Sequence, residues 1–152
     1  MTASHLNPLP VCQAGPVRWT PLFMAWLTTL LATAGAVFLG EVMGMTPCVL
    51  CWYQRIAMFP LVVILGLGLF EGDDRSVRHA WPLAWAGCGM ALYHCMVFWG
   101  LVSAGLTPCG KGPSCADANL QVAGWLPIPL LSLSAFTAVL MLLWLAGRKA
   151  TS

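Results

Sequence analysis

The stretch TPCVLCWYQR, residues 46–55, opens an apolar segment that runs to residue 70 and follows another that covers residues 20–40. It combines a Thr-Pro step, two cysteines separated by two residues, and an arginine one turn further along. Thr46 is a favoured N-cap residue and Pro47 suits the first helical position, so a helix is expected to start here. The junction therefore places two sulfur atoms at the beginning of an apolar helix.

The overall composition indicates an integral membrane protein. Of the 152 residues, 59% are hydrophobic and only 8% are charged, and the mean hydropathy is +0.81. These values lie far outside the range of soluble globular domains. The formal net charge is only +2, and the basic residues are scattered, which excludes a nucleic-acid-binding surface.

Four apolar stretches approach or exceed the roughly 20 residues that a helix needs to cross about 30 Å of hydrocarbon. Polar and turn-forming residues separate them, such as EGDDRSVRH at 71–79. We therefore predict an all-α membrane protein, a four-helix transmembrane bundle that forms one domain over residues 1–152 and contacts membrane lipid. The expected spans are approximately residues 20–40, 47–70, 80–104 and 125–146.

The distribution of Lys and Arg predicts the orientation, because cytoplasmic loops carry an excess of them. Five of the seven fall on one face of this topology, namely Arg18, Arg75, Arg78, Arg148 and Lys149. Both termini are therefore expected to be cytoplasmic. The two loops on the other, oxidising side carry four cysteines in two close pairs, Cys48 with Cys51 and Cys109 with Cys115. A cleavable signal peptide is the alternative for the first span, but the apolar stretch is long for a signal core.

The first cysteine pair has the position of a redox site. Cys48 is expected in the first helical turn, where unpaired backbone N–H groups and the helix dipole favour a thiolate. Cys51 lies three residues on and shares the same helix face. A disulfide or a dithiol can form between the two with little rearrangement.

Arg55 is four residues beyond Cys51, which puts its guanidinium on the cysteine face, roughly 11 Å into the span at 1.5 Å per residue. A central arginine costs about 2.5 to 3.5 kcal/mol on insertion scales, so an intramembrane arginine indicates a functional site. One alternative is that Arg55 reaches the headgroups and serves only as an interfacial residue. The other is that Arg55 donates hydrogen bonds to a membrane-dissolved ligand whose oxygens gain negative charge on reduction, as those of a quinone head group do.

The second pair lies in TPCGKGPSC, residues 107–115, where two glycines and a proline between the cysteines allow the loop ends to meet. Its disulfide is expected to be exposed. A structural staple is one interpretation, and a relay that passes two electrons between the pairs through mixed disulfides is the other. Zinc held by all four thiolates is a further alternative, but an oxidising compartment disfavours four free thiolates, so no metal site is expected.

The residues CVLCWYQR at 48–55, together with Pro60, resemble the disulfide bond formation protein B family, DsbB. The run GWLPIPLLSLSAF at 124–136 is similar to the same region of its short-loop members, the C type (BdbC-like). The resemblance implies a protein that reoxidises a soluble thioredoxin-fold (DsbA-like) dithiol oxidase and passes the electrons to a membrane quinone, ubiquinone or menaquinone. It also implies a place in the bacterial cytoplasmic (inner) membrane, with the redox loops outside the cytoplasm.

Carried onto this chain, the resemblance makes Cys48 and Cys51 the quinone-proximal pair and Arg55 the residue that orients the quinone. Cys109 and Cys115 would receive electrons from the soluble partner. Only five residues separate these two cysteines, whereas the best-known members have a longer loop with its cysteines far apart.

His94 falls in the third expected span, where some family members carry a histidine near the quinone. We expect it at a depth similar to that of Arg55, either as a quinone contact or as a hydrogen-bonded packing residue. The remaining cysteines have no counterpart in the motif. Cys88 and Cys95 are expected to be packing residues, and Cys12 a free cytoplasmic thiol.

Two other functions compete with this one. A vitamin K epoxide reductase-like protein also combines four spans, paired cysteines and a quinone, but its quinone-proximal pair lies late in the bundle. A non-catalytic membrane scaffold stapled by two disulfides would carry the same cysteines without turnover. Quinone-dependent oxidation of a reduced thioredoxin-like protein distinguishes an enzyme from a scaffold.

Overall fold

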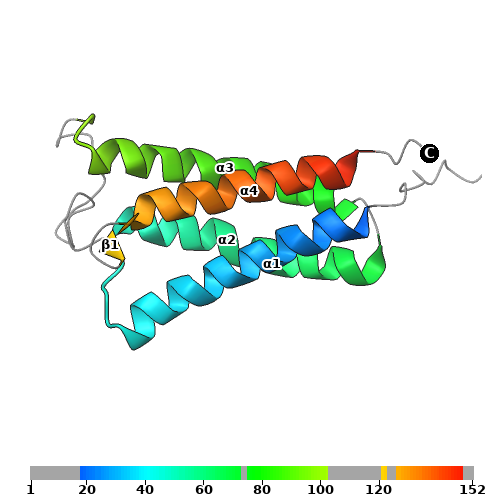
Figure 1. The fold of residues 1–152 in the computed structure, drawn as a ribbon, viewed down its shortest axis with the longest axis horizontal. Coiled ribbons are helices and arrows are strands. Elements are labelled where there is room, and N and C mark those ends of the chain that lie inside the picture. The colour runs from blue at the N-terminus through cyan, green and yellow to red at the C-terminus, as the bar shows by residue number, and fades with distance from the viewer. Residues whose placement is uncertain (1–17, 73–74, 103–120, 123–125, 149–152) are drawn as a thin grey trace, which may run out of the picture.

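The computed structural model describes residues 18–72, 75–102, 121–122 and 126–148. In this part of the chain, long helices lie lengthwise beside one another (Figure 1). Their bounds are α1 Trp19–Val37, which continues into the π-helical turn η1 Phe38–Val42, then α2 Val49–Glu71, α3 Arg75–Phe98 and α4 Ile128–Gly147. Two short strands, β1 Gln121–Val122 and β2 Leu126–Pro127, pair antiparallel just before α4, and they are too short to change the all-α class.

The helices close into a ring in which each packs mainly against two neighbours. The contacting pairs are α1 with α2, α2 with α3, α3 with α4, and α4 with α1. Figure 1 shows the start of α1, the end of α2, the start of α3 and the end of α4 at one end of the bundle. The other end holds η1, the start of α2, the end of α3 and the start of α4. Arg18 and Arg148 thus flank one end and Cys48 belongs to the opposite end, while the membrane side that each end faces stays a prediction.

Small residues let the helix backbones approach in the interior. Ala25, Ala80 and Ala84 are fully buried, and alanine and glycine are the residues that allow close helix contacts in membrane proteins. A β-carbon at Gly87 on α3 would overlap the buried ring of Phe136 on α4. The contact between α3 and α4 therefore depends on the absence of a side chain at Gly87.

The outer faces of the bundle are apolar, as lipid contact requires. Leu31, Val63, Phe70 and Met141 are all more than half exposed. Three helical segments are long and apolar enough to cross a membrane: Trp19–Val42, Val49–Glu71 and Ile128–Gly147. These segments confirm a membrane-spanning length and composition for three of the four predicted spans.

The third predicted span differs from its prediction in composition and in bounds. α3 does not meet the criteria that the other three meet within the described residues. Arg75 and Arg78 occupy its first turns, and Pro82, Tyr93 and His94 lower the hydropathy of the remainder. It also ends at Phe98 instead of near residue 104. After Phe98, the N–H of Leu101 donates to the carbonyl of Met96, and the N–H of Gly100 donates to the carbonyl of Val97. Gly100 has a left-handed backbone, with φ +71°. This combination is a Schellman motif, which ends the helix. A membrane crossing by α3 stays a prediction.

Candidate functional site

Helix α2 begins two residues later than the sequence indicates. Cys48, not Thr46, is the N-cap: its backbone is extended (φ −69°, ψ 166°) and Val49 is the first helical residue. The sulfur of Cys48 accepts a hydrogen bond from the backbone N–H of Cys51 at 3.3 Å. The placement of Thr46 at the N-cap and of Cys48 in the first turn was therefore wrong, because Cys48 is itself the N-cap and its sulfur accepts from the N–H of the third helical residue.

The two sulfur atoms at this helix end are in contact. Cys48 Sγ lies 2.9 Å from Cys51 Sγ, and both residues are free thiols in the structure. A disulfide bond is about 2.05 Å long, so an approach of less than about 1 Å would bring the sulfurs to bonding distance. Cys48 is only 1% exposed, whereas Cys51 is partly exposed, so a reagent reaches Cys51 more easily.

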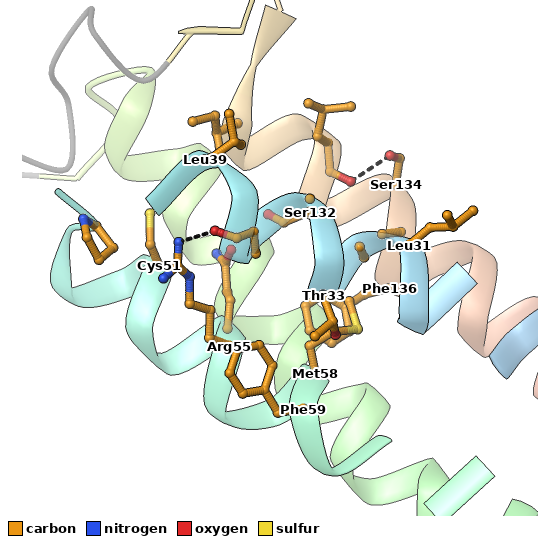
Figure 2. A pocket seen from close by; sticks show the side chains of 18 of the residues that line it. Leu31, Thr33, Leu39, Cys51, Arg55, Met58, Phe59, Ser132, Ser134 and Phe136 are labelled. Carbon is orange, nitrogen blue, oxygen red and sulfur yellow. Dashed lines mark hydrogen bonds between the residues drawn. The ribbon is translucent and has the colours of Figure 1, made fainter. Parts of the chain in front are cut away.

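A cavity of about 500 Å³ opens beside the cysteine pair, between α1, η1, α2 and α4 (Figure 2). Figure 1 shows α1 diverging from the other helices towards this end. Most of the lining is apolar, including Leu31, Leu39, Met58 and Phe136. Cys48, Cys51 and Arg55 also line it. The volume and the mixture of an apolar wall with a few polar groups are typical of a small-molecule site.

The side chain of Arg55 is hydrogen-bonded to the last turn of α1. Its Nη2 donates to the carbonyl of Ala36 at 2.6 Å, and a β-carbon at Gly40 would lie 3.1 Å from Nη2. Ala36 lies in the last turn of α1, where the helix changes to the π-helical η1, a change that often accompanies functional sites. The described residues place no carboxylate within ion-pair distance of Arg55, so its positive charge is available to a ligand in the cavity.

His94 contacts the cysteine pair from α3 and is not among the residues that line the cavity. Its Nε2 lies 3.7 Å from Cys48 Sγ, and its Nδ1 lies 3.1 Å from Gln54 Nε2. Gln54 is a site residue that the sequence reasoning missed. A search for the partner that a buried histidine needs in an apolar span would have pointed to Gln54, a buried polar residue of the neighbouring helix.

Cys48, Cys51 and His94 together have the donor atoms of a soft-metal site, since their ligand atoms all lie within 4.8 Å of one another. Two sulfurs bound tetrahedrally to zinc at about 2.3 Å would be roughly 3.8 Å apart. The sulfurs here are 2.9 Å apart. The arrangement is therefore closer to the geometry of sulfur exchange than to that of metal ligation.

Several predicted residues are separate from this cluster. Cys12, Cys109 and Cys115 lie outside the described residues, so their predicted roles stay predictions. Cys95 is buried and Cys88 is partly buried against the core, as expected for packing residues.

The chain ends that flank the second cysteine pair lie at the cavity end of the bundle. Val102, which follows α3, packs against the apolar cluster that contains Cys48. Ile128, the first residue of α4, lines the cavity. Both residues therefore lie at the end of the bundle that holds the first cysteine pair.

Comparison with known proteins identifies the family. The sequence profile described as "Disulfide bond formation protein DsbB" matches residues 18–146, which include every described helix except the last residue of α4. No solved structure gave a significant match.

Curated relatives agree with the profile. A "Probable disulfide formation protein" of Metapseudomonas resinovorans is 40% identical over 147 residues, covering 96% of this chain and 99% of the relative. "Disulfide bond formation protein C" of Bacillus subtilis (strain 168) is 35% identical over 129 residues, covering 84% of this chain and 94% of that protein. A "Probable disulfide formation protein" of Deinococcus radiodurans is 39% identical over 144 residues, covering 88% and 93%. With a family profile over most of its length and relatives of this similarity, the chain belongs to the disulfide bond formation protein B (DsbB) family and is a bacterial membrane protein of disulfide formation.

Proposed function

We propose that the protein is a quinone-dependent thiol–disulfide oxidoreductase of the bacterial cytoplasmic (inner) membrane, with its redox loops outside the cytoplasm and α3 as its fourth span. It reoxidises a thioredoxin-fold (DsbA-like) dithiol oxidase and transfers the electrons to ubiquinone or menaquinone. The observation that carries the proposal is the contact of two thiols with each other at the wall of an apolar cavity.

The cavity supports a quinone as the electron acceptor. Its apolar lining suits a ligand that is dissolved in the bilayer, and three of the lining residues, Leu31, Phe59 and Leu131, are also exposed on the outside of the bundle. The reduced pair gives up two electrons and two protons as the Cys48–Cys51 disulfide forms, and the quinone takes both to become a hydroquinone. Contact between thiols and acceptor inside one cavity removes the need for a metal or a second carrier.

Arg55 supports the same assignment from the polar side of the cavity. A guanidinium has five N–H donors, and one of them is directed to the carbonyl of Ala36. The group lines the cavity, and we assign its remaining donors to a quinone oxygen, which becomes more negative during reduction. In a site with little water this interaction is stronger than it would be in solvent.

The second cysteine pair connects this site to the soluble partner in the proposed cycle. A thiolate of the partner attacks the Cys109–Cys115 disulfide, and resolution of the mixed disulfide leaves the partner oxidised and the loop pair reduced. The loop dithiol then reduces the Cys48–Cys51 disulfide. The described residues on either side support this step, because Val102 packs against the cluster that contains Cys48 and Ile128 lines the cavity beside the pair.

The test is an anaerobic assay with purified protein, quinone and a reduced thioredoxin-fold dithiol protein, in which quinone absorbance reports reduction. Wild type is expected to reduce one quinone for each partner dithiol that is oxidised. Cys48→Ser and Cys109→Ser should both abolish turnover with the partner. Cys88→Ser is the matched control, since this cysteine lies in α3 away from the cavity lining, and it should keep full activity.

Two outcomes would contradict the proposal. Wild type without any quinone reduction would favour a non-catalytic scaffold. Full activity in both Cys48→Ser and Cys109→Ser would show that the electrons follow another route.

A further inference from the structure

Two buried polar side chains connect in series to the sulfur of Cys48. Gln54 on α2 is 6% exposed and His94 on α3 is 0% exposed. Gln54 Nε2 lies 3.1 Å from His94 Nδ1, and His94 Nε2 lies 3.7 Å from Cys48 Sγ. Polar groups buried in an apolar interior are costly unless they are hydrogen-bonded, so these three groups depend on one another for their partners.

The direction of the first hydrogen bond decides where the imidazole carries its proton. The amide nitrogen of glutamine is only a donor, so Gln54 Nε2 donates to Nδ1 and Nδ1 must be the unprotonated nitrogen. A neutral ring then carries its hydrogen on Nε2, the atom that faces Cys48. We infer that Gln54 is a positioning residue that holds His94 in the Nε2-protonated tautomer and thereby directs an N–H group at the sulfur of Cys48.

This arrangement deepens the proposed function, on which its consequence for catalysis rests. The pair gives two electrons and two protons to the quinone when the Cys48–Cys51 bond forms, and in this step one sulfur acts as a thiolate that attacks the other. Cys48 is the sulfur that accepts from the Cys51 N–H, at 3.3 Å, and from His94 Nε2–H. Gln54 therefore favours Cys48 as the attacking thiolate in the step that re-forms the disulfide.

The opposite tautomer gives a measurable contrast. If the amide of Gln54 presented its oxygen to the ring, Nδ1 would carry the hydrogen and Nε2 would have a lone pair directed at Cys48. Nitrogen-15 NMR separates the two forms, because protonated and unprotonated ring nitrogens resonate in different regions. The chain has three histidines, and His94→Gln identifies the resonances of His94 by their loss.

The experiment uses full-length, histidine-labelled, reduced protein in lipid nanodiscs without quinone or partner. Wild type should show His94 with Nδ1 unprotonated and Nε2 protonated. Gln54→Glu keeps the size of the side chain, and its carboxylate offers only acceptor oxygens, so Nδ1 should become protonated at a pH where the carboxyl is ionised. Ser134→Ala is the control, because the Ser134 hydroxyl bonds only within its own helix and its loss should leave the resonances of His94 unchanged. A protonated Nδ1 in wild type, or unchanged His94 resonances in Gln54→Glu, would overturn the inference.

A kinetic measurement tests the consequence for catalysis. Gln54→Leu removes the amide, and loss of one neutral hydrogen bond should slow formation of the Cys48–Cys51 disulfide about fivefold. Because Gln54 also lines the cavity, the rates of wild type and variant are compared at saturating quinone. Rapid alkylation followed by mass spectrometry measures disulfide formation in reduced protein that is mixed with quinone. An unchanged rate would refute the role of Gln54 in this step. An inactive wild-type protein would instead refute the proposed function, and the NMR result on the tautomer would stand apart from it.

Discussion

Gly40 lies in η1 against the guanidinium of Arg55, and replacing it by alanine tests whether that guanidinium must be held in place. A β-carbon at this position would lie 3.1 Å from Nη2 and 3.2 Å from Nη1 of Arg55. These distances are shorter than ordinary van der Waals contact, so the guanidinium has to move by a few tenths of an ångström. The hydrogen bond from Nη2 to the carbonyl of Ala36 is already short, at 2.6 Å, so the movement also changes this bond.

The size of the effect follows from the strength of the contacts that Arg55 makes. A hydrogen bond to a charged group contributes about 1.5 to 3 kcal/mol. If the displacement removes about half of one such bond between Arg55 and the quinone, quinone binding weakens by about 1 kcal/mol. Since 1.4 kcal/mol corresponds to a factor of ten, the KM for quinone should rise about fivefold.

The assay is steady-state quinone reduction at saturating reduced partner, with Gly89→Ala as the matched control. Gly89 lies in α3 and is not a lining residue of the cavity, and a β-carbon there would meet nothing within 4 Å. Both substitutions favour helix by up to about 1 kcal/mol, so a general gain in helix stability cancels between them. An equal KM for Gly40→Ala and Gly89→Ala would refute the claim that the position of Arg55 controls quinone binding.

Three further predictions concern single side chains. Arg55→Lys keeps the charge but loses the planar fork of donors, so the KM for quinone should rise more than about tenfold in the same assay; an unchanged KM would mean that charge alone suffices. Thr33 Oγ1 is buried without a hydrogen-bond partner among the described residues, whereas the Thr28 hydroxyl donates to the carbonyl of Met24 in its own helix. Thr33→Val should therefore raise the free energy of unfolding by up to about 1 kcal/mol relative to Thr28→Val. Thermal unfolding in detergent measures this difference, and a Thr33→Val protein no more stable than Thr28→Val would contradict it. Gly87→Ala should destabilise the protein by about 1 to 3 kcal/mol, because the added methyl overlaps the Phe136 ring; the same unfolding measurement checks it, and an unchanged midpoint would argue against close α3–α4 packing.

The fold was largely predictable because the apolar stretches are long and the polar gaps are short. The start of α4 follows from Pro127 and Pro129, which suit a helix beginning. The end of α3 was not predictable from hydropathy, since apolar residues continue past it. Gly100 ends that helix through its left-handed backbone, and the apolar residues around it masked this signal.

The candidate site was predictable where residues lie on one helix and not where they come from two. Cys48, Cys51 and Arg55 share a face of α2 by their spacing alone, and the structure places all three at one cavity. The hydrogen bond between Gln54 and His94 joins residues 40 positions apart in the chain. Contacts of this kind depend on how α2 and α3 pack, which the pattern of each segment does not contain.

The central claim is that the Cys48–Cys51 dithiol gives its electrons directly to a quinone, and one titration tests it. Fully reduced protein with both Cys109→Ser and Cys115→Ser, which lacks the loop pair, is titrated anaerobically with quinone. Hydroquinone is counted by absorbance, and the disulfide formed is mapped by mass spectrometry. The account predicts one hydroquinone per protein and a disulfide between Cys48 and Cys51. Quinone that stays oxidised, or a disulfide that joins other cysteines, would contradict it.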